Sequence, residues 1–229
     1  MRADAICFDK DGTLFDFGAT WEAWARSFLL RAADQDHDRA ADFGRKIGFD
    51  LATNRFAKDS IVIAGTAGEV AAAMAPMLPH IAPDAVLDFL NEEAMSAPQA
   101  EAVPLIAFLD RLRAMGLRLG VATNDAESPA RAHLDSAGIT NRFDFIAGFD
   151  SGHGGKPAAG QLLAFARLVQ VPTGRVVMVG DSTHDLRAGR AAGMQTVGVL
   201  TGLAEAADLA PFADIVLPDI GHLPEWLMG

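Results

Sequence analysis

Short, mostly apolar segments alternate with helical patterns over the second half of the chain. We predict strands at 117–122, 143–147, 175–179, 196–199 and 214–217. Short segments of this kind, and above all a continuous apolar run such as 5–8, are typical of strands that are buried in a parallel sheet. Because the strands alternate with helices, the pattern predicts a doubly wound parallel α/β sheet in which the last strand lies at an edge.

Proline and glycine mark the expected ends of the intervening helices. One helical pattern covers 104–116, and in the next Ser128 is the expected N-cap, followed by Pro129 as the first helical residue. Two further helices are expected over 157–169 and 185–192, and a short helix is expected at the C-terminus.

The first apolar run, 5–8, is far from the other strands in the sequence. The stretch between them has helical character, with Trp21 and Trp24 at helical spacing, and only 60–63 fits a strand and a helix start equally well. We therefore predict a core domain and an inserted, all-helical cap domain. Their expected bounds are 1–14 and 96–229 for the core, and 15–95 for the cap.

Composition and charge narrow the class of protein. Hydrophobic residues make up 50% of the chain, which excludes general disorder, and the single cysteine excludes an internal disulfide framework. The formal net charge of -11 argues against nucleic acid and anionic membranes as partners, because an acidic surface repels both. The apolar stretch 61–78 carries Glu69 and Pro76, and Asp4 lies where a signal peptide would be apolar, so we expect a cytoplasmic protein.

Polar residues follow four of the predicted strands, at the positions where open parallel sheets bind ligands. These residues are Asp9, Asp11, Thr123, Lys156 and Asp181. The carboxyl ends of parallel strands lie at one edge of a sheet, so we expect these side chains in one pocket, with Lys10 pointing away from it. Asp185 follows at a helix start, on the same helix face as Asp181.

Such a pocket would hold three or four carboxylates and a single lysine. These carboxylates cannot all stay ionised without more positive charge, and an oxygen-rich site suits Mg²⁺. With the cation present, a phosphate group could bind there and contact Lys156 and the Thr123 hydroxyl. A carboxylate held against phosphorus can attack it to form an aspartyl-phosphate, and Asp11 is placed to protonate the leaving alcohol and then to activate water.

Four segments of the chain resemble, in order, the four motifs of the haloacid dehalogenase superfamily. The segments are Asp9-Lys10-Asp11-Gly12-Thr13, a Thr at a second strand end, Gly155-Lys156-Pro157 and Gly180-Asp181-Ser182-Thr183-His184-Asp185. The resemblance covers the core and the cap together. The helical cap and Gly148-Phe149-Asp150 are most similar to the phosphoglycolate phosphatase-like members.

The resemblance implies a role for each acidic residue of the first and last motifs. It implies Asp9 as nucleophile and metal ligand, and Asp11 as acid/base with its backbone carbonyl on Mg²⁺. It implies Asp181 as the other carboxylate that binds the metal. Asp11 argues against the dehalogenase branch of the superfamily, because members of that branch lack an acid at this position.

The resemblance also implies which residues contact the phosphoryl group. These are Thr123 and Lys156, and Asp185 is expected to support the metal through water or through Lys156. Asn124 and Thr13, which belong to the same segments, are expected to support the site. It does not indicate which cap residues bind the substrate.

The sequence thus predicts a Mg²⁺-dependent phosphomonoester hydrolase of a small anionic metabolite, with 2-phosphoglycolate as one candidate. A sugar-phosphate mutase of the β-phosphoglucomutase type is an alternative, because it would use the same site and return the phosphoryl group to the sugar. A phospho-accepting signalling module is an alternative from another class, although such modules are single small domains without a cap. The expected partner is a small phosphorylated metabolite, with no nucleic acid and no membrane, and the oligomeric state stays open.

Some residues near the expected site also have a purely structural interpretation. Trp21 and Trp24 are more typical of the core of the cap than of a substrate wall. His184 is expected to face solvent, with a contact to substrate as the alternative. A cluster of cap cations is expected to be a solvated face, with a seat for a substrate carboxylate as the alternative: Arg45, Lys46, Arg55 and Lys58.

Overall fold

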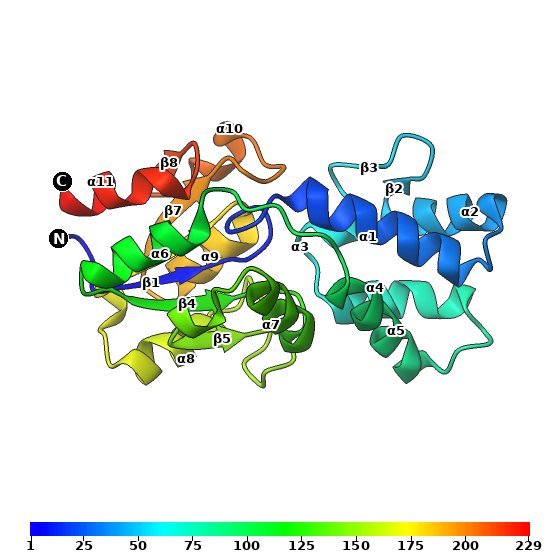
Figure 1. Cartoon of the computed structure of the whole chain (residues 1–229), viewed down its shortest axis with the longest axis horizontal. Helices are drawn as coiled ribbons and strands as arrows, with labels where there is room; N and C mark the ends of the chain where they lie inside the picture. The colour runs from blue at the N-terminus through cyan, green and yellow to red at the C-terminus, as the bar shows by residue number, and fades with distance from the viewer.

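The chain contains a six-stranded parallel sheet with the strand order β5-β4-β1-β6-β7-β8 (Figure 1). The computed structural model describes residues 1–229, except for the side chain of Ala64. The strands are β1 (Ala5–Phe8), β4 (Arg118–Ala122), β5 (Phe145–Ala147), β6 (Val176–Gly180), β7 (Gln195–Val199) and β8 (Ile215–Leu217). Each lies within two residues of its predicted bounds, and β8 occupies an edge as expected.

Helices cover both faces of this sheet, because successive strand residues point to opposite faces. In β1, Ile6 and Phe8 belong to one hydrophobic cluster and Ala5 and Cys7 to another, and all four are fully buried. The first cluster is completed by α6 (Leu105–Ala114), α7 (Glu127–Ser136) and α11 (Leu223–Met228), the second by α8 (Gly160–Val169) and α9 (Thr183–Ala191). A one-turn helix, α10 (Ala206–Leu209), precedes β8. The doubly wound α/β fold is therefore confirmed.

The residues between β1 and α6 form a helical insert that lies to the right of the sheet in Figure 1. Its helices are α1 (Phe17–Ala32), α2 (His37–Ile47), α3 (Ile61–Ala64), α4 (Ala67–Met74) and α5 (Pro83–Met95). They pack around a hydrophobic cluster of their own, which includes Trp24, Phe28 and Phe43. The domain bounds at residues 15 and 96 stay a prediction.

Two details of the insert go beyond the sequence pattern. Two-residue strands, β2 (Phe49–Asp50) and β3 (Arg55–Phe56), form an antiparallel pair that was not predicted. The ambiguous segment 60–63 starts a helix, because the Ser60 hydroxyl accepts a hydrogen bond from the Val62 amide at the beginning of α3.

The apolar stretch 61–78 is divided among α3, α4 and a 3₁₀ turn (Ala75–Met77). Among the described residues, no helix is long and apolar enough to cross a membrane.

Three predicted helix starts are wrong, and one of them is the start of α9, which begins at Thr183 rather than at Asp185. Helix α7 begins at Glu127, so Ser128 is not its N-cap and Pro129 is its third residue. The Glu127 amide donates instead to the carboxylate of Asp150, which is distant in the sequence and takes over the role of a cap. Helix α8 begins at Gly160 rather than at Pro157, because residues 157–159 form a turn before it.

Candidate active site

The register of the parallel strands brings the polar strand ends to one edge of the sheet. Phe8 of β1 pairs with Val121 of β4 and Val179 of β6, so the residues that follow these strands are neighbours. The predicted site residues that line one common cavity are Asp9, Asp11, Thr123, Asn124, Lys156, Asp181 and Asp185. Thr13 differs from them: it is fully buried and is not among the residues that line the cavity.

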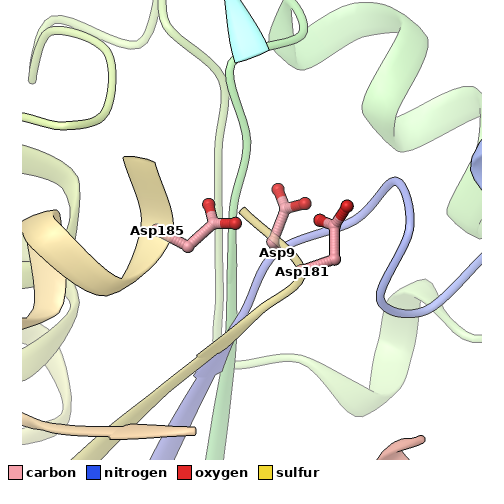
Figure 2. A group of neighbouring side chains, drawn as sticks. All are labelled: Asp9, Asp181 and Asp185. Atoms are coloured by element: carbon pink, nitrogen blue, oxygen red, sulfur yellow. The ribbon is translucent and has the colours of Figure 1, made fainter. Parts of the chain in front are cut away.

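Three carboxylates meet in this cavity (Figure 2). Asp9 follows β1, Asp181 follows β6, and Asp185 lies in the first turn of α9. Each offers an oxygen atom within 4.8 Å of the others, and all three residues are buried. The side chain of Asp11 lines the cavity but is not part of this group.

Lys156 is the cation that offsets these carboxylates. Its Nζ lies 2.6 Å from Asp9 Oδ1 and 2.6 Å from Asp185 Oδ1, and its side chain is only 2% exposed. Burial alone would lower the pKa of this ammonium group, but the charges of Asp185 and Asp9 outweigh burial and raise the pKa above its ordinary value. Lys156 is therefore firmly charged.

One lysine does not balance three buried carboxylates. Burial raises the pKa of Asp9 to about 7, against the opposing effect of Lys156 and with a further contribution from the charges of Asp185 and Asp11. Burial and the charges of Asp185 and Asp9 also raise the pKa of Asp181 well above its ordinary value. This excess of negative charge, carried by oxygen ligands, fits a hard divalent cation, so the cluster could hold a metal ion.

Glycines allow the chain to approach two of these carboxylates closely. A Cβ atom added to Gly12 or to Gly202 would overlap the carboxylate of Asp181, and one added to Gly180 would overlap the side chain of Asp185. Gly12 also has a φ of 76°, a conformation that other residues rarely adopt. The glycine of the first motif is thus required both by the turn after β1 and by the position of Asp181.

Asp185 contacts both its own helix and Lys156. Its Oδ1 binds Lys156, while its Oδ2 accepts hydrogen bonds from the Ser182 amide at 3.0 Å and the Ser182 hydroxyl at 2.7 Å. The Ser182 hydroxyl in turn accepts a hydrogen bond from the Asp185 amide, which completes a capping box at the start of α9. Asp185 is therefore fixed at the point from which it holds Lys156.

The segment after β4 supports Lys156 from the other side. The side chain of Asn124 accepts a hydrogen bond from the Lys156 amide at 2.7 Å and donates one to the Lys156 carbonyl at 2.9 Å. The hydroxyl of Thr123 accepts a hydrogen bond from the Asp125 amide at 3.1 Å, and Gln161 donates to the Thr123 carbonyl at 3.0 Å. These contacts fix both residues at the edge of the cavity.

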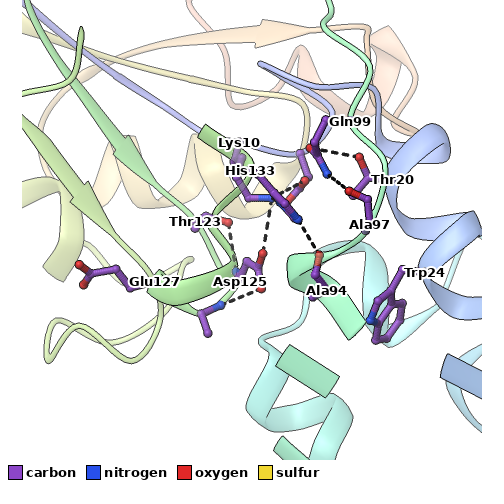
Figure 3. Close-up of polar contacts among 12 residues, drawn as sticks. Lys10, Thr20, Trp24, Ala94, Ala97, Gln99, Thr123, Asp125, Glu127 and His133 are labelled. Atoms are coloured by element: carbon purple, nitrogen blue, oxygen red, sulfur yellow. Dashed lines mark hydrogen bonds and ion pairs between the residues drawn. The ribbon is translucent and has the colours of Figure 1, made fainter. Parts of the chain in front are cut away.

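Lys10 does not point away from the site, as the alternation of a strand predicts. It lies in the turn after β1, where its Nζ is 2.7 Å from Asp11 Oδ1 and 3.5 Å from Asp125 Oδ2, and it is fully buried. Its Nζ is also 2.9 Å from Nδ1 of His133, whose Nε2 lies 2.6 Å from the Ala94 carbonyl at the end of α5 (Figure 3).

Burial and the charge of Lys10 lower the pKa of His133 to about 4. The neutral ring can therefore accept a hydrogen bond from Lys10 and donate one to Ala94. This chain of contacts connects Asp11 with the end of the insert.

Comparisons with known proteins agree with this geometry. A model of the haloacid dehalogenase-like hydrolase family matches residues 3–193. A phosphoglycolate phosphatase from Rhodospirillum rubrum is 32% identical over 230 residues, which cover 97% of this chain and 90% of the relative. The chain belongs to the haloacid dehalogenase-like hydrolase family. The prediction of an enzyme of this family is thereby confirmed.

Solved structures of this family share the fold of the hydrolase. A predicted phosphoglycolate phosphatase from Haemophilus somnus has a TM-score of 0.71 at 18% identity, with 99% of this chain and 98% of that chain covered. A β-phosphoglucomutase from Clostridium difficile has a TM-score of 0.68 at 18% identity, with 99% and 96% covered. At this identity the likeness shows the fold alone.

The helical insert of the hydrolase closes the cavity over the carboxylates. The Ala67 amide of α4 donates to the Asn124 carbonyl at 3.3 Å, and an added Cβ at Gly68 would approach the ring of Phe149. Trp21 and Trp24 belong to the hydrophobic cluster of the insert, as the sequence favoured, and they also line the cavity, where a contact with substrate stays a prediction. His184, expected to face solvent, lines the same cavity.

The cluster of insert cations does not line this cavity. Arg45 pairs with Asp42 and Arg55 with Glu22, and Lys58 reaches Glu205 of the core at 2.7 Å. These three cations are more than 70% exposed, and Lys46 is exposed as well. The cluster is the solvated face that the sequence favoured.

Sequence reasoning missed three residues of the site. Lys10 and His133 contact each other across 123 positions of sequence, and nothing in either local pattern indicates a partner at that distance. Asn91 lines the cavity from α5, directly after the apolar positions of that helix. No local signal distinguishes Asn91, because Asp84 and Asp88 lie on the same side of α5.

Proposed function

We propose that this hydrolase is a Mg²⁺-dependent phosphomonoesterase that forms an aspartyl-phosphate on Asp9. The environment of Asp9 supports the proposal most strongly. Its carboxylate lies at a strand end in the cavity, bound to Lys156 and grouped with Asp181 and Asp185. Such a carboxylate can attack a phosphoryl group that a cation and Lys156 hold in place.

The reaction proceeds in two displacements at phosphorus. First, an Asp9 oxygen attacks, a bond from Asp9 to phosphorus forms, and the bond from phosphorus to the alcohol oxygen breaks as Asp11 donates a proton to that oxygen. Then Asp11 accepts a proton from water, and the water oxygen attacks phosphorus and releases phosphate and Asp9. Lys10 orients Asp11 for both proton transfers through its 2.7 Å contact.

The carboxylates of Asp9 and Asp181 would hold the metal, and the backbone carbonyl of Asp11 would be a further ligand. Asp185 acts through Lys156, because both of its oxygens already have partners in the protein. When bound, Mg²⁺ would neutralise the phosphoryl oxygens and stabilise the charge that develops during transfer. Thr123 and Lys156 would contact the same oxygens.

We also propose that residues 15–95 form a cap that opens to admit substrate and closes on the core, residues 1–14 and 96–229. Closure excludes water from the cavity, and loop or domain closure of this kind gates turnover without changing the chemical step. We take 2-phosphoglycolate as the reference substrate, because the relative from Rhodospirillum rubrum is named a phosphoglycolate phosphatase.

The test of the mechanism compares Asp9→Asn and Asp11→Asn with the wild-type enzyme. With Mg²⁺ and a panel of phosphomonoesters, Asp9→Asn should abolish phosphate release, and Asp11→Asn should slow it by about 10²–10⁴-fold, as expected for loss of a general acid. Acid quenching followed by mass spectrometry should find phosphate on the peptide that contains Asp9. Undiminished hydrolysis by Asp9→Asn would refute the mechanism.

The same experiment separates the alternatives. A mutase would convert a sugar 1-phosphate into its 6-phosphate with little release of phosphate. A signalling module would accumulate long-lived phospho-Asp9 without turnover. Removal of the metal with a chelator should stop phosphate release, and added Mg²⁺ should restore it.

A further inference from the structure

The wall of the cavity opposite the carboxylates is apolar. The insert forms it with side chains that include Phe17, Trp21, Trp24, Val62, Val70 and Leu90. Among the described residues that line the cavity, Asn91 is the only insert side chain with a polar group apart from the two indoles. The cavity therefore joins a strongly charged base to a nearly uncharged wall.

Asn91 presents an unused hydrogen-bond acceptor. Its Oδ1 is buried and has no hydrogen-bond partner among the described residues. A buried acceptor without a partner destabilises the structure until a donor binds it, so such an atom in a cavity is a suitable contact for a ligand. A hydroxyl or amide N–H of the substrate would satisfy it.

Among the described residues, the insert contributes no cation to the lining of this cavity. Its cations Arg45, Arg55 and Lys58 are exposed and paired elsewhere, and none of them lines the wall. Lys156 is held by Asp9 and Asp185 at the base. Of the described lining residues, His184 from α9 is the only other one whose side chain can carry a positive charge.

We infer that the alcohol released by this hydrolase is uncharged and mostly apolar, and that it carries a hydrogen-bond donor for Asn91. The inference rests on the proposed phosphatase function and specifies its substrate class. A leaving group with a carboxylate, such as that of 2-phosphoglycolate, would bury an unpaired charge against the wall, which is strongly unfavourable. The carboxylates at the base would repel it as well.

The cavity is small and partly open to solvent. Its volume is about 70 Å³. On this scale one water molecule takes roughly 10–15 Å³, so the space corresponds to about five water molecules. A phosphoryl group and a short alcohol would occupy most of this space.

A pair of esters of nearly the same size, of which one carries a carboxylate and the other an uncharged amide, tests the inference. With saturating Mg²⁺, kcat/KM is measured for 2-phosphoglycolate and for its primary amide, 2-phosphoglycolamide, which has nearly the same size and a donor N–H. We expect the amide to be hydrolysed at least tenfold more efficiently. Asn91→Lys places a cation in the wall and should reverse this preference, whereas Ser96→Lys adds the same charge at an exposed position just after α5 and should not.

A third ester keeps the test independent of the lysine variant. Asn91→Leu removes the acceptor but conserves the size of the side chain, so it should lower kcat/KM for the amide about tenfold relative to n-propyl phosphate, which has no donor. Equal losses for both esters would contradict the role of Asn91.

The remaining outcomes are distinguishable. A wild-type preference for 2-phosphoglycolate over its amide would overturn the inference and leave the phosphatase function intact, and loss of that preference in His184→Gln would place the carboxylate on His184. Hydrolysis of none of these esters, nor of any other ester in a broad panel, would instead refute the proposed function.

Discussion

Asp9 should destabilise the metal-free protein as the pH rises, and Asp9→Asn should remove this effect. The folded protein holds the Asp9 proton more tightly than the unfolded chain does, because burial raises the pKa from 3.8 to about 7. The stability contributed by the protonated carboxyl is therefore complete below pH 3.8 and is lost as the pH rises to about 7. Asparagine resembles the protonated carboxyl in shape and charge, so the variant lacks this loss.

The size of the effect follows from the two pKa values. Their difference is roughly three pH units, and each unit corresponds to about 1.4 kcal/mol, which gives about 4 kcal/mol in total. Of the interval between the two pKa values, about two pH units, from pH 5 to about pH 7, lie within the range from pH 5 to pH 8. Over that interval wild type should lose about 3 kcal/mol relative to Asp9→Asn, as an order of magnitude.

Urea unfolding of both proteins with a chelator present, at pH 5 and pH 8, measures this difference. His133 has the opposite effect, since its pKa of about 4 lies below the ordinary value and its contribution is lost as the pH falls from 6.5 to 4, but it is common to both proteins. Asp88→Asn, at an exposed position of α5, is the matched control and should follow wild type.

Saturating Mg²⁺ should stabilise wild type more than Asp9→Asn at pH 8, because the cation replaces the missing positive charge. If wild type and Asp9→Asn showed parallel pH dependence without metal, the reasoning on the burial of Asp9 would be wrong.

Two further changes test the packing of the site. Gly12→Ala and Gly116→Ala both introduce a side chain at positive φ, but only the first overlaps the carboxylate of Asp181, since nothing lies within 4 Å of the added Cβ at Gly116. Gly12→Ala should therefore weaken Mg²⁺ binding at least tenfold by isothermal titration, and Gly116→Ala should leave it unchanged. Lys10→Met leaves the carboxylates of Asp11 and Asp125 without their buried cation. It should lower the free energy of unfolding, measured with urea, by about 3–5 kcal/mol. The added change Asp125→Asn should recover part of that loss, and no recovery would show that the two residues are not coupled.

Much of the fold could be predicted because strands that are buried on both faces of a sheet consist mostly of apolar residues. All six strands of the sheet are mostly apolar segments, and the polar residues among them stand at the start of β4 and β7, so the strand positions follow from the pattern. Helix ends follow less well, because distant residues can satisfy the first amides of a helix. The Asp150 carboxylate accepts a hydrogen bond from the Glu127 amide, so α7 begins at Glu127, before the local signal at Ser128.

The base of the site could also be predicted, since parallel strand ends necessarily meet at one edge. Asp9, Lys156 and Asp181 lie in the cavity where this rule places them. The apolar wall that the insert forms could not be predicted in the same way. Asn91 reaches the cavity only through the packing of the insert on the core, which no local pattern specifies.

The charged base and the apolar wall of the cavity both affect the charge interactions of Asp9. A nucleophilic carboxylate must be ionised, yet in the metal-free cavity the pKa of Asp9 is about 7, so a large fraction is protonated at neutral pH. A divalent cation beside Asp9 would lower that pKa, so metal binding and activation of the nucleophile would be one event. The apolar wall from the insert keeps water out and strengthens every charge interaction inside. Under the proposed function, an acidic pocket in a protein of net charge -11 would accept a phosphate anion only together with a cation, and the uncharged wall would disfavour a second anion on the same substrate.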